Sequence, residues 1–178
     1  MMDDKSSSRK IVLIGLDNAG KTCIARALRG LRDLGDYCDL ESTFGQDIKR
    51  TSVGGYKIAL WDLGGQVDNR RSHIEEFDLK IQNADKIIFV VDIQERERYN
   101  EAIDYFSKIL ELLEDESSFP EILLLLHKYD YSIMEEEEYS KSNLRKSIVQ
   151  PIREKIPDQI NFSVYKTLIS AEFTKIEF

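Results

Sequence analysis

The sequence predicts an α/β fold of three layers, in which helices cover both faces of a mostly parallel six-stranded sheet with one antiparallel edge hairpin. Short, continuous apolar runs alternate along the chain with segments of helical periodicity, the pattern of strand and helix units. A glycine-rich loop separates the first apolar run from the first helical segment. The pair Gly54-Gly55 lies between two strand patterns and suits a hairpin turn.

The first strand is predicted to lead directly into the first helix. Residues 1–9 are polar and lack periodicity, so we expect a flexible tail. The run KIVLIGL at 10–16 is nearly all apolar, as in a parallel strand buried on both faces. Residues 21–34 place apolar side chains at helical spacing, and Gly35 is a suitable stop for that helix.

The remaining elements continue the alternation. Strands at 46–53 and 56–62 are expected to form the hairpin, and Pro151 is expected to start or kink a helix. A buried strand, an amphipathic helix and two more strands are predicted, in chain order, at 86–92, 99–113, 122–126 and 161–166.

Length and composition predict one domain, residues 10–178 of a chain of 178. The net charge of -8 and pI of 4.9 disfavour nucleic acid and anionic membranes as main partners. The longest apolar run is about five residues, against roughly 20 for a membrane span, and no lipidation signal is present, so we expect a cytoplasmic chain with at most peripheral membrane association. Cys23 and Cys38 are expected to be reduced thiols, Cys23 as a core side chain.

The segment GLDNAGKT, from Gly15 to Thr22, fits the phosphate-binding pattern G-x-x-x-x-G-K-[ST] between a buried strand and a helix. The glycines let consecutive backbone N–H groups point at phosphate oxygens, and the helix N-terminus adds partial positive charge. Lys21 is predicted to bridge the β- and γ-phosphates, and the Thr22 hydroxyl to bind Mg²⁺. The predicted nucleotide contacts here are Gly15, Asp17, Asn18, Ala19, Gly20, Lys21, Thr22 and Cys23.

A second motif, WDLGGQ at 61–66, begins where a predicted strand ends. Asp62 is expected to hold the metal through water, Gly65 to offer its N–H to the γ-phosphate, and Gln66 to orient the attacking water. Thr43 lies in the preceding loop, where its hydroxyl can complete magnesium coordination. The predicted metal ligands are therefore Thr22, Thr43 and Asp62, and the predicted catalytic residues are Lys21, Thr43, Gly65 and Gln66.

A third motif, HKYD at 127–130, follows the fifth predicted strand. Asp130 can accept hydrogen bonds from N1–H and the exocyclic amine of guanine, which adenine does not present. The stem of Lys128 can lie against the base. His127, Thr167 and Leu168 are the other predicted base contacts, with Ser170-Ala171 as the alternative to the last two, and the predicted ligands are GTP or GDP with Mg²⁺.

From Lys10 to Ser170 the chain resembles the small GTPases, whose fold is the Ras-like form of the P-loop NTPase sheet. GLDNAGKT, the TFG at 43–45, WDLGGQ and FVVDIQERERYNEA at 89–102 look like the Arf family. HKYD, LEST at 40–43 and YKT at 165–167 instead resemble the Rag GTPases, which work as dimers.

The resemblance implies a GTP-binding switch with slow intrinsic hydrolysis, served by effector, exchange-factor and activating proteins. This fold normally ends in a full C-terminal helix, but only about eight residues follow Ser170, so we expect that helix to be short or missing. The Rag-like features leave open a scaffold subunit of a GTPase dimer that holds nucleotide without hydrolysis. An ATP kinase is a third candidate, although no arginine-rich lid is evident.

Three residues depart from the expected pattern or carry little signal. His127 replaces the usual Asn, so nucleotide binding is expected to be weaker or pH-sensitive. Asp17 occupies the loop position nearest the γ-phosphate, where its carboxylate would repel charge and crowd Gln66. His73 is expected to be an exposed residue at a helix start.

Overall fold

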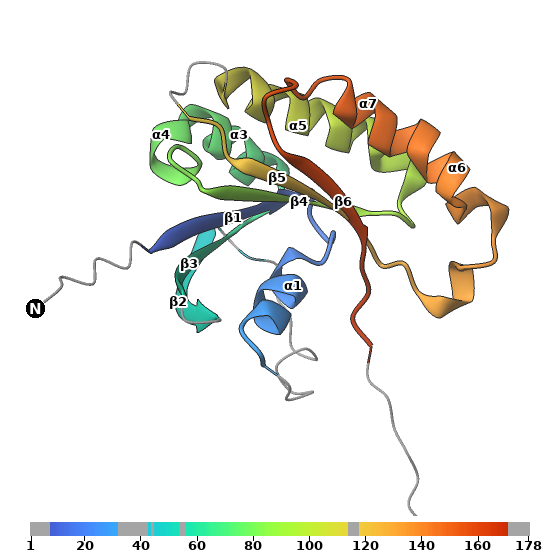
Figure 1. Cartoon of the computed structure of the whole chain (residues 1–178), viewed down its shortest axis with the longest axis horizontal. Coiled ribbons are helices and arrows are strands. Elements are labelled where there is room, and N and C mark those ends of the chain that lie inside the picture. The colour runs from blue at the N-terminus through green and yellow to red at the C-terminus, as the bar shows by residue number, and fades with distance from the viewer. Residues whose placement is uncertain (1–7, 32–42, 44, 54–55, 114–117, 171–178) are drawn as a thin grey trace, which may run out of the picture.

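A six-stranded sheet with strand order β2-β3-β1-β4-β5-β6 forms the centre of the computed structural model, which describes residues 8–31, 43, 45–53, 56–113 and 118–170 (Figure 1). Its strands are β1 (Arg9–Gly15), β2 (Gln46–Val53), β3 (Tyr56–Leu63), β4 (Lys86–Asp92), β5 (Glu121–His127) and β6 (Phe162–Lys166). The predicted fold class is confirmed.

The sheet is parallel except at one edge. Strand β1 pairs in parallel with both β3 and β4, and the parallel pairing continues through β5 to β6. Only β2 and β3 are antiparallel, as the predicted hairpin requires. The carboxyl ends of β1, β3, β4, β5 and β6 therefore meet at one edge of the sheet, where ligands bind in open α/β folds.

Helices cover the two faces unequally (Figure 1). One face carries α1 (Lys21–Leu28), and the other carries α3 (Val67–Glu75), α4 (Phe77–Lys80), α5 (Tyr99–Leu113), α6 (Lys141–Leu144) and α7 (Gln150–Arg153). Short helical turns lie at η1 (Arg96–Arg98), η2 (Tyr131–Ile133), η3 (Glu137–Tyr139) and η4 (Arg145–Val149).

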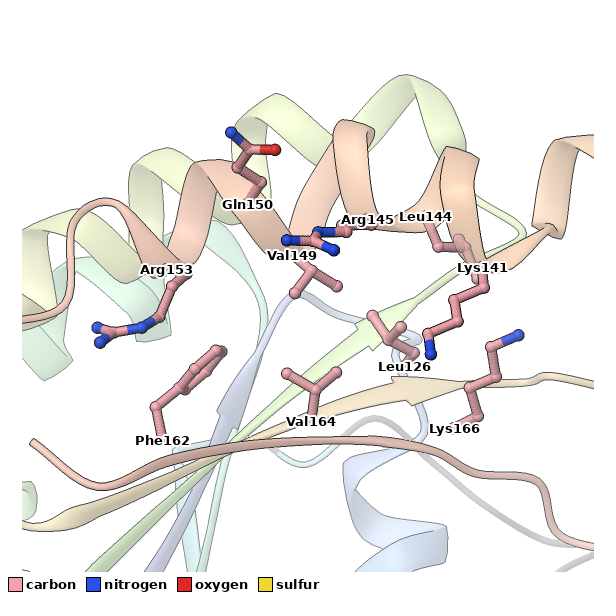
Figure 2. Close-up of a pocket in the computed structure, with 10 residues that line it drawn as sticks. All are labelled: Leu126, Lys141, Leu144, Arg145, Val149, Gln150, Arg153, Phe162, Val164 and Lys166. Atoms are coloured by element: carbon pink, nitrogen blue, oxygen red, sulfur yellow. The ribbon is translucent and has the colours of Figure 1, made fainter.

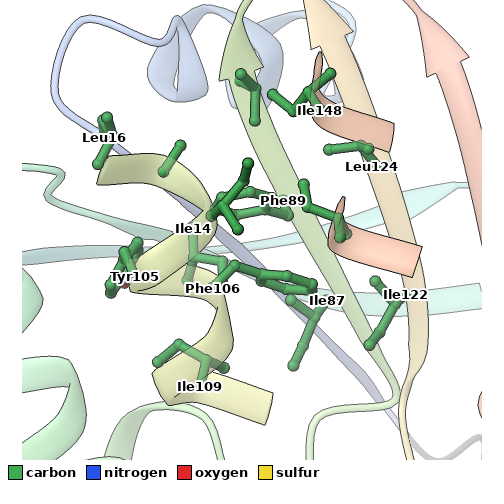
Figure 3. Close-up of a cluster of buried hydrophobic side chains, with 14 of the residues drawn as sticks. Ile14, Leu16, Ile87, Phe89, Tyr105, Phe106, Ile109, Ile122, Leu124 and Ile148 are labelled. Atoms are coloured by element: carbon green, nitrogen blue, oxygen red, sulfur yellow. The ribbon is translucent and has the colours of Figure 1, made fainter. Parts of the chain in front are cut away.

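The main core lies between the sheet and α5, and Figure 3 shows its larger side chains. Phe89 of β4 stacks on Phe106 of α5 with ring centroids 4.4 Å apart, and neither ring is exposed. Full burial of one such side chain contributes roughly 1.5–3 kcal/mol. A smaller apolar cluster lies under α1 and includes Leu13, Ile24 and Val90. Apolar clusters therefore pack against both faces of the sheet.

Several element boundaries differ from those predicted. Helix α1 ends at Leu28 instead of residue 34, and Gly30 follows in the left-handed region with φ 76°. Strand β1 begins at Arg9, inside the predicted tail. The helical segments between 67 and 80 had no predicted bounds, and the helix start expected near His73 lies earlier, at Val67.

Some predictions fall outside the described residues. These concern most of the tail, Gly35, Cys38, the Gly54-Gly55 turn and the C-terminal residues from Ala171 onward. Within the described part of the chain, no helix combines the length and apolar character needed to cross a membrane.

Candidate nucleotide site

The loop between β1 and α1 has a backbone that only glycine fits at two positions. Gly15 has φ 150°, and a Cβ there would come 2.2 Å from the carbonyl oxygen of Val90. Gly20 has φ 88°, and a Cβ there would come 2.5 Å from Cδ2 of His127. The loop therefore lies against both β4 and the end of β5. It immediately precedes α1, so the helix N-terminus faces the loop.

Lys21, the first residue of α1, is held inside this loop. Its side chain is buried, and Nζ donates hydrogen bonds to the carbonyl oxygens of Gly15 at 3.1 Å and Leu16 at 2.8 Å. Burial lowers the pKa of this ammonium to about 8. The loop thus contains a desolvated cation that an incoming phosphate would stabilise.

Three oxygen-bearing side chains meet at the mouth of the loop. Thr22 Oγ1 lies 2.8 Å from Thr43 Oγ1 and donates to Asp62 Oδ2 at 2.7 Å. Thr43 Oγ1 is 3.3 Å from the same carboxylate oxygen. These three residues come from α1, the loop before β2, and the end of β3.

This cluster fits a magnesium ion. Asp62 is 3% exposed, burial raises its pKa, and its Oδ1 has no hydrogen-bond partner among the described residues. Hydroxyl and carboxylate oxygens are the donors that Mg²⁺ prefers. Thr22 and Thr43 would hold the ion, and the carboxylate of Asp62 would hold it directly or through water.

The turn after β3 packs directly on the phosphate loop. The N–H of Asp17 donates to the carbonyl oxygen of Gly65 at 3.0 Å. A Cβ on Gly65 would come 2.3 Å from Asp17 N, so this contact also requires glycine. Gln66 follows, exposed, immediately before α3. The structure therefore brings Gly65 and Gln66 to the phosphate loop, and their roles in hydrolysis stay predictions.

A cavity of about 340 Å³ unites these groups. Its lining consists of Asp17, Asn18, Gly20, Lys21, Thr22, Cys23, Thr43, Gly65, Gln66 and Lys128. Cys23 is half-buried and faces this cavity, so the expectation that it is a core side chain was wrong. Ala19 is instead buried in the cluster under α1. The lining joins three of the sequence motifs at one place.

The motif HKYD at 127–130, predicted to read the base and called the base loop below, lies at the end of β5 beside the same cavity. Lys128 has φ 60°, and its Nζ lies 2.6 Å from Asp92 Oδ2. Gln94 Nε2 donates to Asp130 Oδ2 at 2.7 Å and to the Lys128 carbonyl oxygen at 2.8 Å. Sequence reasoning missed Gln94, although it comes two residues after a strand that ends at this edge.

His127 is buried between the base loop, the phosphate loop and the segment after β6. Its Nδ1 lies 3.0 Å from Thr167 Oγ1, and burial lowers its pKa, so the ring is neutral at neutral pH. The backbone N–H of Thr167 donates a hydrogen bond to the carbonyl oxygen of Leu126 at 2.9 Å, and the N–H of Tyr129 donates to the carbonyl oxygen of Thr167 at 3.1 Å. Thr167 therefore lies in contact with the loop at 127–130, whereas the role of Leu168 stays a prediction from the sequence.

One expectation about a single residue was wrong, and another residue has a partner that was not expected. The Asp17 carboxylate lines the cavity, and its Oδ1 binds Arg98 Nη2 at 2.7 Å. The wrong expectation concerns His73. His73 is 1% exposed and lies near the end of α3, with Nδ1 2.7 Å from the hydroxyl of Tyr105. Both partners are distant in sequence, which is why the local pattern did not indicate them.

A larger apolar groove of about 650 Å³ lies elsewhere, between β6 and the α6–α7 segment (Figure 2). Val149 from the helical side and Val164 from β6 point into it, and Lys141 and Lys166 lie at one end. None of the catalytic or metal-binding candidates lines this groove. Volume therefore does not identify the site, whereas convergent polar groups do.

Comparison with known proteins identifies sequence relatives. The model of the ADP-ribosylation factor family matches residues 1–169. The chain is 34% identical over 138 residues to ADP-ribosylation factor-like protein alp41 of Schizosaccharomyces pombe, covering 77% of this chain and 69% of that protein. It is 33% identical over 121 residues to ADP-ribosylation factor F of Dictyostelium discoideum, covering 68% of this chain but only 60% of that relative.

Solved structures show the same fold at low sequence identity. The Arl6 BBS3 small GTPase of Trypanosoma brucei, solved with the nucleotide analogue GppNp, matches with a TM-score of 0.68 and 19% identity, covering 91% of this chain and 87% of that one. The mammalian SRP receptor matches with a TM-score of 0.71 and 15% identity, covering 90% and 91%. At these identities the likeness supports the fold alone.

Proposed function

The chain belongs to the ADP-ribosylation factor family of small GTPases, and we propose that it is a switch that binds GTP or GDP with Mg²⁺ and hydrolyses GTP slowly. One observation carries the proposal: Thr22, Thr43 and Asp62 meet within 3.3 Å at the mouth of the phosphate loop. A bound magnesium ion would neutralise phosphate charge there. Thr43 precedes β2, so a bound ion would add a link between this residue and the nucleotide.

Guanine selection is assigned to Asp130. Gln94 already donates to one of its carboxylate oxygens, which fixes the direction of the side chain. The remaining acceptor positions can take the N1–H and amine protons of guanine. Adenine lacks this donor pair and would leave the carboxylate poorly matched.

Hydrolysis is assigned to groups that share the cavity lining. Gln66 lines the same cavity as Lys21 and can orient a water molecule against the γ-phosphate. Lys21 and the N–H of Gly65 would stabilise the negative charge that develops on the phosphate oxygens. A slow rate is expected because the described residues place no arginine side chain in the lining of this cavity.

The output of the switch is a changed surface. Loss of the γ-phosphate would remove the contacts proposed for Thr43 and Gly65, and would so change the surface around Thr43, the turn at Gly65 and helix α3. Effector, exchange-factor and activating proteins are the partners such a surface serves. A cytoplasmic location, and a Rag-like dimer suggested by the HKYD motif, stay predictions from the sequence.

The decisive experiment compares GTP, GDP and ATP binding by calorimetry with Mg²⁺, followed by single-turnover GDP formation. We expect guanine nucleotides to bind, ATP to fail, and Gln66→Leu to bind GTP normally while losing hydrolysis. Gln159→Leu is the matched control, because this exposed glutamine precedes β6 at the opposite end of the sheet. Preferential binding of ATP would reject the proposal, and GTP binding with no turnover in the wild type would favour a scaffold.

A further inference from the structure

A chain of four alternating charges connects the phosphate loop to helix α3. Asp17 Oδ1 lies 2.7 Å from Arg98 Nη2, and Arg98 Nε lies 2.9 Å from Glu101 Oε2. The other oxygen of Glu101, Oε1, lies 2.6 Å from Arg70 Nη2 on α3. The four residues belong to four separate segments of the fold: the loop after β1, the turn η1, helix α5 and helix α3.

Arg98 is the centre of this network. Its Nη1 also binds Glu95 at 2.9 Å, so each of its three nitrogens contacts a different carboxylate. Only a guanidinium presents donors in a rigid planar fork that can do this. The Arg98 side chain is 24% exposed, which limits its freedom to leave the network.

The charge states of the partners agree with this geometry. Partial burial by itself raises the pKa of Asp17, but the hydrogen bond and charge of Arg98 outweigh it and hold the pKa below its ordinary value. The hydrogen bond from Arg98 likewise lowers the pKa of Glu101. Both carboxylates are therefore ionised at neutral pH, and Arg98 stands between them.

The position of Asp17 makes this neutralisation matter for nucleotide binding. Asp17 lines the same cavity as Lys21 and Gln66, where a triphosphate would place its γ-phosphate. An unneutralised carboxylate there would repel the terminal phosphate of GTP and would have a smaller effect on GDP, which lacks that group. The ion pair with Arg98 turns the Asp17 carboxylate towards η1, and the positive charge of Arg98 offsets its negative charge.

We propose that Arg98 is a positioning residue for the γ-phosphate: it holds the Asp17 carboxylate against η1 and offsets its charge, so that an acidic phosphate loop accepts GTP as well as GDP. The inference deepens the proposed function and rests on it. Glu95 and Glu101 keep the guanidinium oriented, and Arg70 extends the network to the helix that follows Gln66.

The test measures the ratio of GTP to GDP affinity in Arg98 variants, by displacement of a fluorescent GDP from the full chain with Mg²⁺. We expect Arg98→Ala to lower the ratio about 10-fold, the effect of one unscreened interaction of about 1.4 kcal/mol. Arg98→Lys keeps the charge but cannot reach three carboxylates, so an intermediate ratio is expected. Arg96→Ala is the matched control, since Arg96 lies on the same turn but pairs with Glu138.

The companion variant removes the charge that Arg98 offsets. Asp17→Asn combined with Arg98→Ala should restore the ratio to within about twofold of the wild type, because no carboxylate remains to be neutralised. A merely structural Arg98 would lower thermal stability and both affinities alike, leave the ratio unchanged, and gain nothing from Asp17→Asn; either result overturns the proposal. A wild type that binds neither guanine nucleotide contradicts the proposed function itself, whereas wild-type binding with an unchanged ratio in Arg98→Ala overturns only the role of Arg98.

Discussion

The imidazole of His127 lies so close to Gly20 that a Cβ at Gly20 would come within 2.5 Å of the ring. This contact joins the base loop at the end of β5 to the phosphate loop before α1. On its other side the ring is within hydrogen-bond distance of Thr167. His127 therefore braces the two loops that we propose bind opposite ends of the nucleotide, the task that the resemblance to small GTPases assigns to an asparagine.

Replacing His127 by alanine is predicted to weaken both GTP and GDP binding about 10-fold, because one hydrogen bond and the packing under Gly20 are lost. Preference for guanine over adenine should survive, since Asp130 is untouched. Fluorescent GDP release rates measure the effect. Tyr131→Ala is the control, because that tyrosine is near the base loop yet 67% exposed; equal release rates in the wild type and His127→Ala would remove the bracing role.

Magnesium dependence follows from the buried carboxylate at the loop mouth. Asp62→Asn keeps the size of the side chain but removes the charge, so the affinity of the GDP complex for Mg²⁺ should fall at least about 10-fold. Addition of a chelator to the wild type should speed GDP release in the same way. Titration of Mg²⁺ against GDP release measures both effects. Asp158→Asn is the control, as this exposed carboxylate pairs with Arg153 before β6; an equal shift in both variants would contradict the assignment.

Much of this site followed from the sequence because each motif stands at the carboxyl end of a buried strand. Strands such as 86–92 have a continuous apolar centre, here residues 87–91, and parallel strands bring their carboxyl ends together whatever the loops do. Helix α3 could not be predicted in this way, because its sequence VDNRRSHIE has no apolar stripe. It is held instead by tertiary contacts, among them the ion pair from Arg70 to Glu101 and the contact between His73 and Tyr105.

Guanine selection by Asp130 predicts a defined change in base preference. Asp130→Asn replaces an acceptor pair by one acceptor and one donor, which mismatches guanine and suits xanthine, whose ring carries a carbonyl in place of the amine. Affinity for GTP should fall at least about 100-fold, and xanthosine triphosphate should then bind better than GTP. Competition between the two nucleotides measures this. Continued preference for GTP in the variant would show that another residue reads the base.

Gln94 is predicted to sharpen the same selection by orienting Asp130. Gln94→Ala removes the amide that donates to Asp130 and to the carbonyl of Lys128. Loss of the bond that orients Asp130 should lower GTP affinity about 3- to 10-fold, equivalent to one hydrogen bond. The measurement is GTP displacement of a fluorescent GDP. In the double variant with Asp130→Asn, loss of Gln94 should have little further effect; additive losses would contradict a role through Asp130.

Residues such as Gln94 and Arg98 escaped sequence reasoning for a common reason. Gln94 meets Asp130 across 36 positions, and Arg98 meets Asp17 across 81, so neither pair leaves a local pattern. Both lie just after β4, at the sheet edge where the motifs gather. Polar residues that follow a central strand are therefore candidates for holding the motif residues, even when they belong to no motif.

The buried histidine of α3 predicts how stability depends on pH. Burial and the nearby positive charges of Lys80, Lys21 and Arg70 lower the pKa of His73 to about 3. Above pH 6.5 the ring is neutral in both the folded and unfolded chain, so it has no effect there. As the pH falls below 6.5, His73 becomes protonated in the unfolded chain but stays neutral in the folded chain. The free energy of unfolding therefore falls by about 1.4 kcal/mol per pH unit.

Between pH 6.5 and 5, His73 should therefore cost about 2 kcal/mol of unfolding free energy. His73→Asn can keep a polar contact to Tyr105 but cannot titrate, so its stability should decline less steeply over this range. Urea unfolding of both proteins at several pH values measures the two slopes. His127 lies outside α3 and is present in both proteins, so its own contribution cancels in the comparison. Parallel slopes would mean that His73 is protonated in the folded chain, and the neutral contact with Tyr105 would have to be abandoned.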